Sequence, residues 1–379
     1  MYMENRLGSR TDITGKKKIL YVEILRIICI VFVIFNHTNY MGYVYFLSSD
    51  IGTLPYWFYM FFTVIAGISV PIFLMISGML LLGKDESIGY VWKKRIPKYV
   101  VILAVFSLIF YILDTNLYHR EFSVKQFLIS VYSEGAIIPY WFLYVYLSFL
   151  ILLPFIRKMA RDITGKEFIY LMAIYFVFIT VVEIFQYRIF NGNVTLIPSL
   201  NPATLCNMVI FYPVIGYYLG ARLKKVTNKM LLISFGLFVI SVIATMLITN
   251  YRLELTGEFT EENANAFIDC ARPLQVVFVF LLARKLFENR KFSSLAEKVI
   301  AFAGGCVFGI YLIEHAYREG LYSIYNVLCT KIDNFIAIWL YVLLIFLICL
   351  VQVAAFRYVI SVFRKTKHKN RSDQTKTPK

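Results

Sequence analysis

The sequence predicts an all-α, polytopic membrane protein with about ten transmembrane helices and both termini in the cytoplasm. Hydrophobic residues make up 59% of the 379 residues, and charged residues make up only 16%. The apolar residues occur in runs that are long enough to cross a bilayer. Because lipid offers the backbone no hydrogen-bond partners, each run that crosses the bilayer is expected to be a helix.

Ten apolar segments support this prediction. The eighth crosses the bilayer only if it begins before Pro273, which would place Asp269 and Arg272 one helical turn apart at the membrane interface. The segments cover residues 19–41, 56–82, 97–113, 137–156, 167–190, 203–221, 230–249, 266–287, 300–323 and 335–357.

The basic residues predict the orientation of the chain. The amino-terminal tail, the loops after segments two, four, six and eight, and the carboxy-terminal tail hold 31 of the 39 Lys and Arg residues. Such residues concentrate on the cytoplasmic side, so both termini are expected there. The expected parts are a cytoplasmic tail (1–18), a ten-helix membrane domain (19–358) and a basic cytoplasmic tail (359–379), of which Arg364 to Lys379 are expected to be disordered.

The net charge of +16 does not indicate a nucleic-acid partner. The basic residues lie in short clusters between apolar runs, with no DNA- or RNA-binding module beside them. The lipid bilayer is the expected partner surface. The six cysteines are scattered singly, so the sequence predicts neither a metal site nor a disulfide framework, and we interpret them as small buried hydrophobic residues.

Arg26 and His37 are polar residues within the first apolar segment. Eleven residues advance a helix by roughly 1,100°, close to three full turns, so both side chains are expected on one face, roughly 16 Å apart along the axis. Glu23 precedes Arg26 by one turn and can pair with it. A neutral imidazole can act as a general base, which makes His37, with Glu23 and Arg26, the predicted catalytic group. The alternative is a core histidine that a neighbouring helix satisfies.

Two further groups of residues are predicted to bind substrate. Tyr311, Glu314 and His315 lie in segment nine at about the depth of His37, and the alternative for them is an interfacial anchor. Arg95 and Lys98 lie in a basic cluster at the start of segment three, where cations can hold phosphates. That cluster is also what the positive-inside rule produces without a ligand.

Three single residues complete the predicted substrate site. Trp141 and Tyr144 belong to an aromatic run in segment four, and such a run is typical of an interface belt as well as of a sugar platform. Glu183 lies within segment five, where a carboxylate is expected to face protein or water and not lipid.

At these residues the chain resembles the acyltransferase-3 family of bacterial membrane acyltransferases. The first-helix signature stands here as Tyr21-Val-Glu-Ile-Leu-Arg26 followed by His37, with Glu23 in place of the usual Asp. Further similar motifs are Pro71-Ile-Phe-Leu-Met-Ile-Ser-Gly78, Tyr140-Trp-Phe-Leu-Tyr144 with Leu153-Pro154, and Phe308-Gly-Ile-Tyr-Leu-Ile. The family's Arg-x-x-Arg motif is Arg95-Ile-Pro-Lys98 here, and Glu314 stands where the family often has His, with His315 one residue later.

The resemblance implies a membrane O-acyltransferase of the bacterial plasma (inner) membrane. Such an enzyme would move acetyl from cytoplasmic acetyl-CoA, its co-substrate, to a hydroxyl of a cell-surface polysaccharide or of its lipid-linked precursor, and no other cofactor is expected. His37 would act as the base or as the acyl carrier. The main alternative is a polysaccharide exporter or flippase, and the third is a membrane sensor or scaffold.

Overall fold

Every regular element in the described part of the chain is a helix, which confirms the predicted all-α class. The computed structural model describes residues 19–117, 121–134, 138–191, 194, 196–197, 202, 207–266 and 269–374. The predicted cytoplasmic tail of residues 1–18 lies outside these ranges.

Seven helical stretches of the described residues are long and apolar enough to cross a membrane, which agrees with a polytopic membrane protein. They are Leu54–Leu81, Ile88–Asn116, Trp141–Asp162, Gly165–Phe190, Asn228–Thr256, Ser294–Ile313 and Asn334–Val362. The other three predicted segments contain the shorter helices α1 (Leu20–Asn36), α10 (Met208–Tyr217) and α13 (Arg272–Phe287), of 17, 10 and 16 residues.

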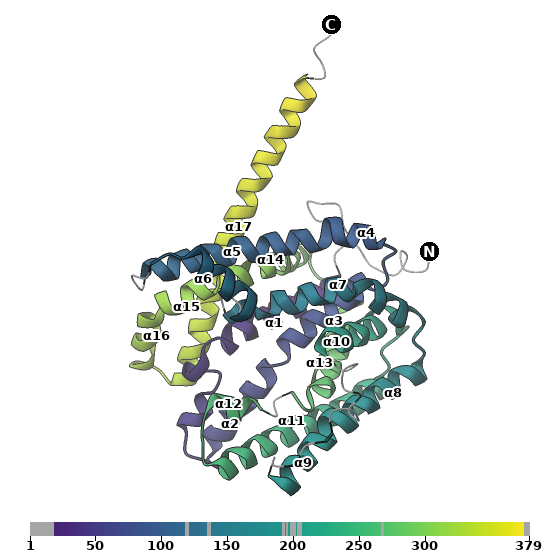
Figure 1. The fold of residues 1–379 in the computed structure, drawn as a ribbon, viewed down its shortest axis with the longest axis vertical. Coiled ribbons are helices and arrows are strands. Elements are labelled where there is room, and N and C mark those ends of the chain that lie inside the picture. The colour runs from purple at the N-terminus through teal and green to yellow at the C-terminus, as the bar shows by residue number, and fades with distance from the viewer. Residues whose placement is uncertain are drawn as a thin grey trace. The chain divides into compact units, whose positions relative to one another are not determined.

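The chain forms two compact units. Their helices are labelled in Figure 1. The first unit contains residues Met1–Phe35 and Lys291–Lys379. Its helix α17 packs against α14 and α16, and the ring of Phe35 stacks on Trp339 of α17 with the centroids 4.7 Å apart. The helices after α1 are α14 (Ser294–Ile313), α15 (His315–Gly320), α16 (Tyr322–Cys329) and α17 (Asn334–Gln374).

The predicted disorder of the carboxy-terminal tail is wrong as far as Gln374, because α17 continues to that residue. The last apolar segment begins this helix, and its backbone pattern continues into the basic residues without a break. No proline stands between Asn334 and Gln374 to end the helix earlier.

The second unit contains residues Asn36–Arg290. Its longer helices are α2 (Leu54–Ala66), α3 (Ser69–Leu81), α5 (Ile96–Leu117), α7 (Trp141–Asp162), α8 (Gly165–Tyr175), α9 (Val182–Phe190), α10, α11 (Asn228–Thr256) and α13. Short helices are η1 (Asn39–Met41), η2 (Tyr45–Ser48), α4 (Ile88–Tyr90), α6 (Val124–Ile129), η5 (Ile138–Tyr140) and α12 (Glu261–Asn265). Wider π-type turns cover η3 (Val91–Arg95), η4 (Ser130–Glu134), η6 (Phe176–Val181) and η9 (Tyr218–Arg222).

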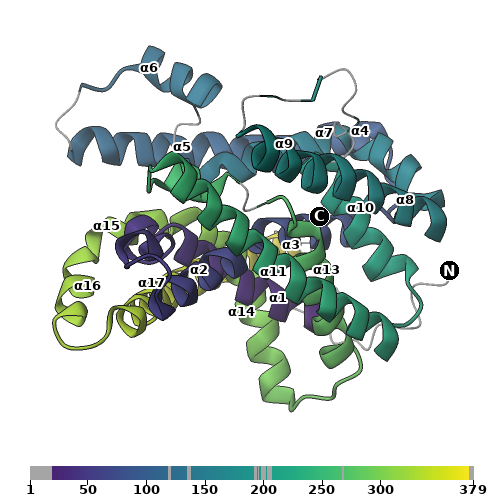
Figure 2. The same cartoon turned by 90° about the horizontal axis from the view of Figure 1, so that it is seen from below.

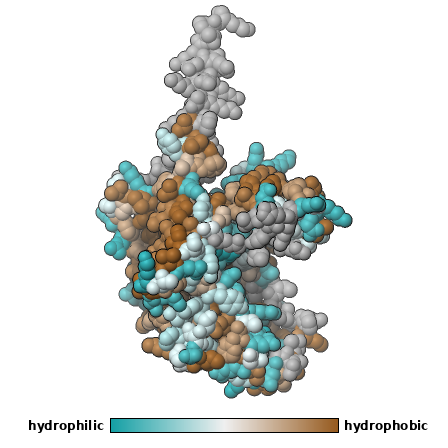
Figure 3. Space-filling model, turned by 90° about the vertical axis from the view of Figure 1, so that its left-hand side faces the viewer, coloured by the Kyte–Doolittle hydropathy of each residue, from teal (hydrophilic) through white to brown (hydrophobic). Residues whose placement is uncertain are grey.

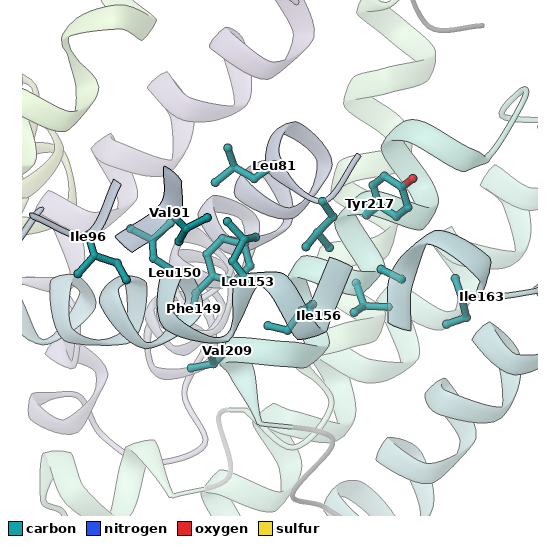
Figure 4. Packing of buried hydrophobic residues seen from close by; sticks show 13 residues of the cluster. Leu81, Val91, Ile96, Phe149, Leu150, Leu153, Ile156, Ile163, Val209 and Tyr217 are labelled. Carbon is teal, nitrogen blue, oxygen red and sulfur yellow. The ribbon is translucent and has the colours of Figure 1, made fainter. Parts of the chain in front are cut away.

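Glycines bring α3 and α10 together at the centre of the second unit. Gly78 lies against the backbone of Pro213, and Gly216 lies against the backbone of Met75. Small residues allow such close helix contacts in membrane proteins, where packing and not hydrophobicity drives association. Side chains of α7 complete this core, in which Phe149, Leu150 and Leu153 are fully buried (Figure 4). Elsewhere in the unit, α11 runs beside α13 (Figure 2).

Many large apolar side chains face outward, as expected of helices that contact lipid. Figure 3 shows apolar side chains across the face that it presents, with hydrophilic ones between them. Examples on α5, α11 and α17 are Val101, Leu232, Ile240, Leu347 and Val351.

We expect Gly216→Ala to lower the thermal unfolding temperature in detergent by several degrees. The added methyl group would overlap the backbone of Met75, and overpacking of this kind typically costs 1–3 kcal/mol. The matched control is Gly236→Ala on α11, where nothing lies within 4 Å of an added methyl group. Equal unfolding temperatures for the two variants would contradict the proposed α3–α10 contact.

Candidate active site

Arg26 and Glu23 form the ion pair that the sequence predicts. Nη1 of Arg26 lies 3.0 Å from Oε1 of Glu23, one turn earlier on α1. The Glu23 side chain is 5% exposed and the Arg26 side chain 29%. Gly304 of α14 makes room for the carboxylate, because a methyl group there would overlap Oε2. The carboxylate is thus fixed, and the guanidinium keeps access to its surroundings.

His37 is the first residue after α1 and is half-buried in the turn that follows. The predicted helix therefore continues from Arg26 as far as Asn36, and His37 itself belongs to the turn. Side chains attach this turn to α2. Nδ2 of Asn36 donates to the carbonyl of Ala66 at 3.2 Å, and the hydroxyl of Thr63 donates to the carbonyl of Tyr43. We call residues 36–43 the histidine turn.

Tyr311, Glu314 and His315 lie where α14 gives way to α15. Tyr311 and Glu314 are buried, and His315 is half-buried. Nδ1 of His315 lies 3.0 Å from Nη2 of Arg318, and the hydroxyl of Tyr341 on α17 donates to the carbonyl of Arg318. The structure thus brings the three predicted residues together on two successive turns of the first unit.

Arg95 is held by a carboxylate that the sequence did not indicate. Nε and Nη2 of Arg95 donate to the two carboxylate oxygens of Glu86, the first at 2.7 Å. Nη2 of Arg157, a buried residue of α7, also donates to Glu86 at 2.7 Å. The hydrogen bond from Arg95, reinforced by Arg157, lowers the pKa of Glu86 from 4.5 to about 2. Lys98 is exposed, with its Nζ 5.3 Å from the centroid of the Tyr99 ring.

Trp141 and Tyr144 lie one turn apart on α7, whereas Glu183 belongs to α9. Trp141 is 42% exposed at the start of α7, and the hydroxyl of Tyr144 donates to the carbonyl of Val131 at 2.8 Å. Glu183 lies in the first turn of α9 and is exposed, and its carboxylate interacts electrostatically with that of Asp269.

Sequence reasoning missed the polar cluster around Arg272. The predicted neighbourhood of Asp269 and Arg272 is confirmed, with Nε 3.0 Å from Oδ1. The side chain of Arg272 itself is fully buried within the protein, at 0% exposed. The available signal was a charged residue within an apolar segment, which by default marks a functional site.

No metal centre is formed by the described residues, among which no group of three or more His, Cys, Asp and Glu side chains is placed to hold an ion. Cys29, Cys270, Cys306 and Cys349 are buried, as interpreted from the sequence, whereas Cys329 is half-buried. Cys206 lies outside the described residues.

A comparison with protein families decides what class of protein carries this site. The family model described as an acyltransferase domain, that of acyltransferase-3, matches residues 19–356. The chain belongs to the acyltransferase-3 family. This acyltransferase is a multi-pass membrane protein whose matched region includes every residue of the predicted site. No curated protein and no solved structure matches it.

We expect Glu86→Gln to lower the unfolding temperature of this acyltransferase by several degrees at pH 7. Because folding lowers the pKa of Glu86, the ion pair stabilises fully above about pH 4.5 and its contribution is lost as the pH falls towards 2. The difference from wild type should shrink over that range in unfolding scans. Asp85→Asn is the control, since the side chain of Asp85 is 100% exposed. A difference that does not depend on pH would contradict the ion pair.

Proposed function

We propose that this acyltransferase moves an acetyl group from cytoplasmic acetyl-CoA to a hydroxyl group of a cell-surface polysaccharide or its lipid-linked precursor, in the bacterial plasma membrane. The observation that carries the proposal is the placement of His37. It lies within the acyltransferase region on a turn that two hydrogen bonds attach to α2. A group that moves a proton needs such a fixed position, and imidazole has the right acidity near pH 7.

The chemistry follows from the role of an imidazole. In the direct route, His37 takes the proton from the acceptor hydroxyl, the hydroxyl oxygen forms a bond to the acyl carbon, and the carbon–sulfur bond breaks. The proton then goes to the sulfur, and CoA leaves as the thiol. In the covalent route, a nitrogen of His37 forms a bond to the acyl carbon, the carbon–sulfur bond breaks, and CoA leaves as the thiol with a proton from the imidazole. The hydroxyl oxygen then bonds to the acyl carbon, the carbon–nitrogen bond breaks, and the freed imidazole takes the hydroxyl proton. The Glu23–Arg26 pair lies on α1, which ends one residue before His37, and is proposed to assist either route.

The donor's phosphates fit the basic cluster of Arg95 and Lys98. Glu86 occupies Nε and Nη2 of Arg95, and none of the described residues accepts a hydrogen bond from its Nη1. The carboxylate therefore fixes one edge of the guanidinium and leaves Nη1 for a phosphate oxygen. Lys98 follows one turn later and adds an exposed ammonium group.

The remaining predicted residues are proposed to bind the acceptor. Tyr311, Glu314 and His315 offer hydroxyl, carboxylate and imidazole groups at one junction, which suits a polyhydroxylated ligand. Trp141, Tyr144 and Glu183 are proposed as further acceptor contacts.

His37→Ala should abolish transfer of labelled acetyl from acetyl-CoA to surface glycan in washed membranes, because it removes the base or acyl carrier. The matched control is His368→Ala, since His368 lies outside the region that matches the family. Wild-type labelling by a membrane-inserted His37→Ala protein would refute this role. Transport of unmodified glycan without label would favour the exporter.

Lys98→Ala should raise KM for acetyl-CoA roughly tenfold with little change in kcat, because a charge-assisted contact to a non-reacting phosphate contributes uniform binding. Lys125→Ala is the control, since Lys125 is exposed on α6 away from the basic cluster in sequence. An unchanged KM would remove Lys98 from the donor site.

A further inference from the structure

The second apolar segment is interrupted between α2 and α3, although it forms one apolar stretch of 28 residues. An interruption frees backbone carbonyls, and within a bilayer the protein itself must supply their partners. The carbonyl of Val64 accepts from Nη1 of Arg272 at 2.5 Å. The carbonyl of Ala66 accepts from Asn36 of the histidine turn and from Ser69. The interruption is thus where the histidine turn and α13 meet α2.

Arg272 uses only two of its three guanidinium nitrogens, Nε and Nη1, to bind the interruption and its neighbours. Nε donates to Asp269 at 3.0 Å, and Nη1 donates to Gln275 at 2.7 Å as well as to Val64. None of the described residues accepts a hydrogen bond from Nη2, which is fully buried. Gly67 leaves the space that Nη2 occupies, because a methyl group there would overlap it.

Two other buried arginines of the same unit show what a purely structural role looks like. Arg157 donates from all three nitrogens, to the carbonyl of Leu81 and to the carbonyl and carboxylate of Glu86. Arg284 likewise uses Nη1 for the carbonyl of Leu223 and Nε and Nη2 for Glu288. An unused donor on a buried guanidinium is costly, so the spare Nη2 of Arg272 indicates a ligand.

The surroundings of Arg272 agree with a site that a ligand can reach. The side chain of Asp269 is 67% exposed, and its carboxylate lies 3.0 Å from Nε of Arg272. The solvent-accessible surface therefore comes as close to the guanidinium as its ion-pair partner. Asn36 and Arg272 bind carbonyls two residues apart in the last turn of α2, and such oxygens lie about 5 Å from each other. His37 follows Asn36 directly, so its backbone belongs to the turn that meets α2 beside the Arg272 contact.

The charge balance indicates which kind of oxygen Nη2 binds. Asp269 already neutralises the guanidinium, which disfavours a ligand with a permanent negative charge. A carbonyl oxygen that becomes negative only during reaction fits better. Acyl transfer creates such an oxygen when the attacking atom adds to the acyl carbon, and the carbonyl re-forms when the carbon–sulfur bond breaks and the thiol leaves with the proton.

We propose that Arg272 is a catalytic residue whose Nη2 donates a hydrogen bond to the oxygen of the transferred acyl group at the interruption between α2 and α3. This inference rests on the proposed function of the site. It assigns the oxyanion-stabilising role to a residue of α13, whereas the proton-transfer role stays with His37.

Arg272→Lys keeps the charge and loses the planar fork. We expect kcat per folded protein to fall roughly a hundredfold, with KM for acetyl-CoA changed less than about threefold. Binding of two inert donor analogues tests the contact itself: a methyl-ketone analogue of acetyl-CoA, and S-ethyl-CoA, which lacks the carbonyl oxygen. Wild type should bind the ketone roughly tenfold more tightly, and Arg272→Lys should bind both equally.

Asp269→Asn tests the inference on an exposed residue, so that it stays falsifiable if Arg272→Lys fails to fold. Removing the neutralising charge should make Nη2 of Arg272 a stronger hydrogen-bond donor and raise the preference for the ketone analogue above that of wild type. Asp85→Asn should leave the ketone preference unchanged. Wild-type kcat in folded Arg272→Lys, or the wild-type ketone preference in either variant, would overturn the inference. Because His37→Ala tests the acyl transfer separately, those results would leave the proposed function standing.

Discussion

The structure depends on one constraint, that a backbone carbonyl freed within a bilayer needs a donor from the protein. At the interruption between α2 and α3 the donors are Arg272 and Asn36, which come from opposite ends of the second unit's sequence. Both hydrogen bonds join residues that are far apart in sequence, and together they tie the histidine turn, α2 and α13 into one polar centre. The fold thereby holds charged and polar groups at a depth where each of them alone would be costly.

Buried arginines serve the helix ends of the second unit in a consistent way. Arg157, Arg272 and Arg284 each donate to carbonyls at or beyond the end of another helical stretch, and each also pairs with a carboxylate. A guanidinium suits this work because its planar fork serves several acceptors at once and stays charged. Counting these residues only as topology signals therefore misses what they do in the folded chain.

Local sequence patterns predicted what local geometry controls. The all-α class follows from apolar runs of spanning length, and the pair of Glu23 and Arg26 follows from helical spacing of three residues. The carboxylate that holds Arg95 shows the limit of such reasoning. Glu86 also pairs with Arg157, which is 71 residues away in sequence, and the two meet only in the folded unit. The interruption at Gly67 also escaped prediction, since one glycine within an apolar run does not by itself end a helix.

The sequence alone determined that this chain is a helical membrane protein of the acyltransferase-3 type, because hydrophobic run length and a spaced motif are properties of the linear chain. Only the tertiary structure decided which polar groups find hydrogen-bond partners within the protein and which keep an unused donor or acceptor. Whether Arg272 uses all its nitrogens, or whether Glu86 occupies one edge of Arg95, depends on partners brought from distant helices. Hydrogen bonding acts over a few ångström, so no pattern along the chain encodes it until the helices have packed.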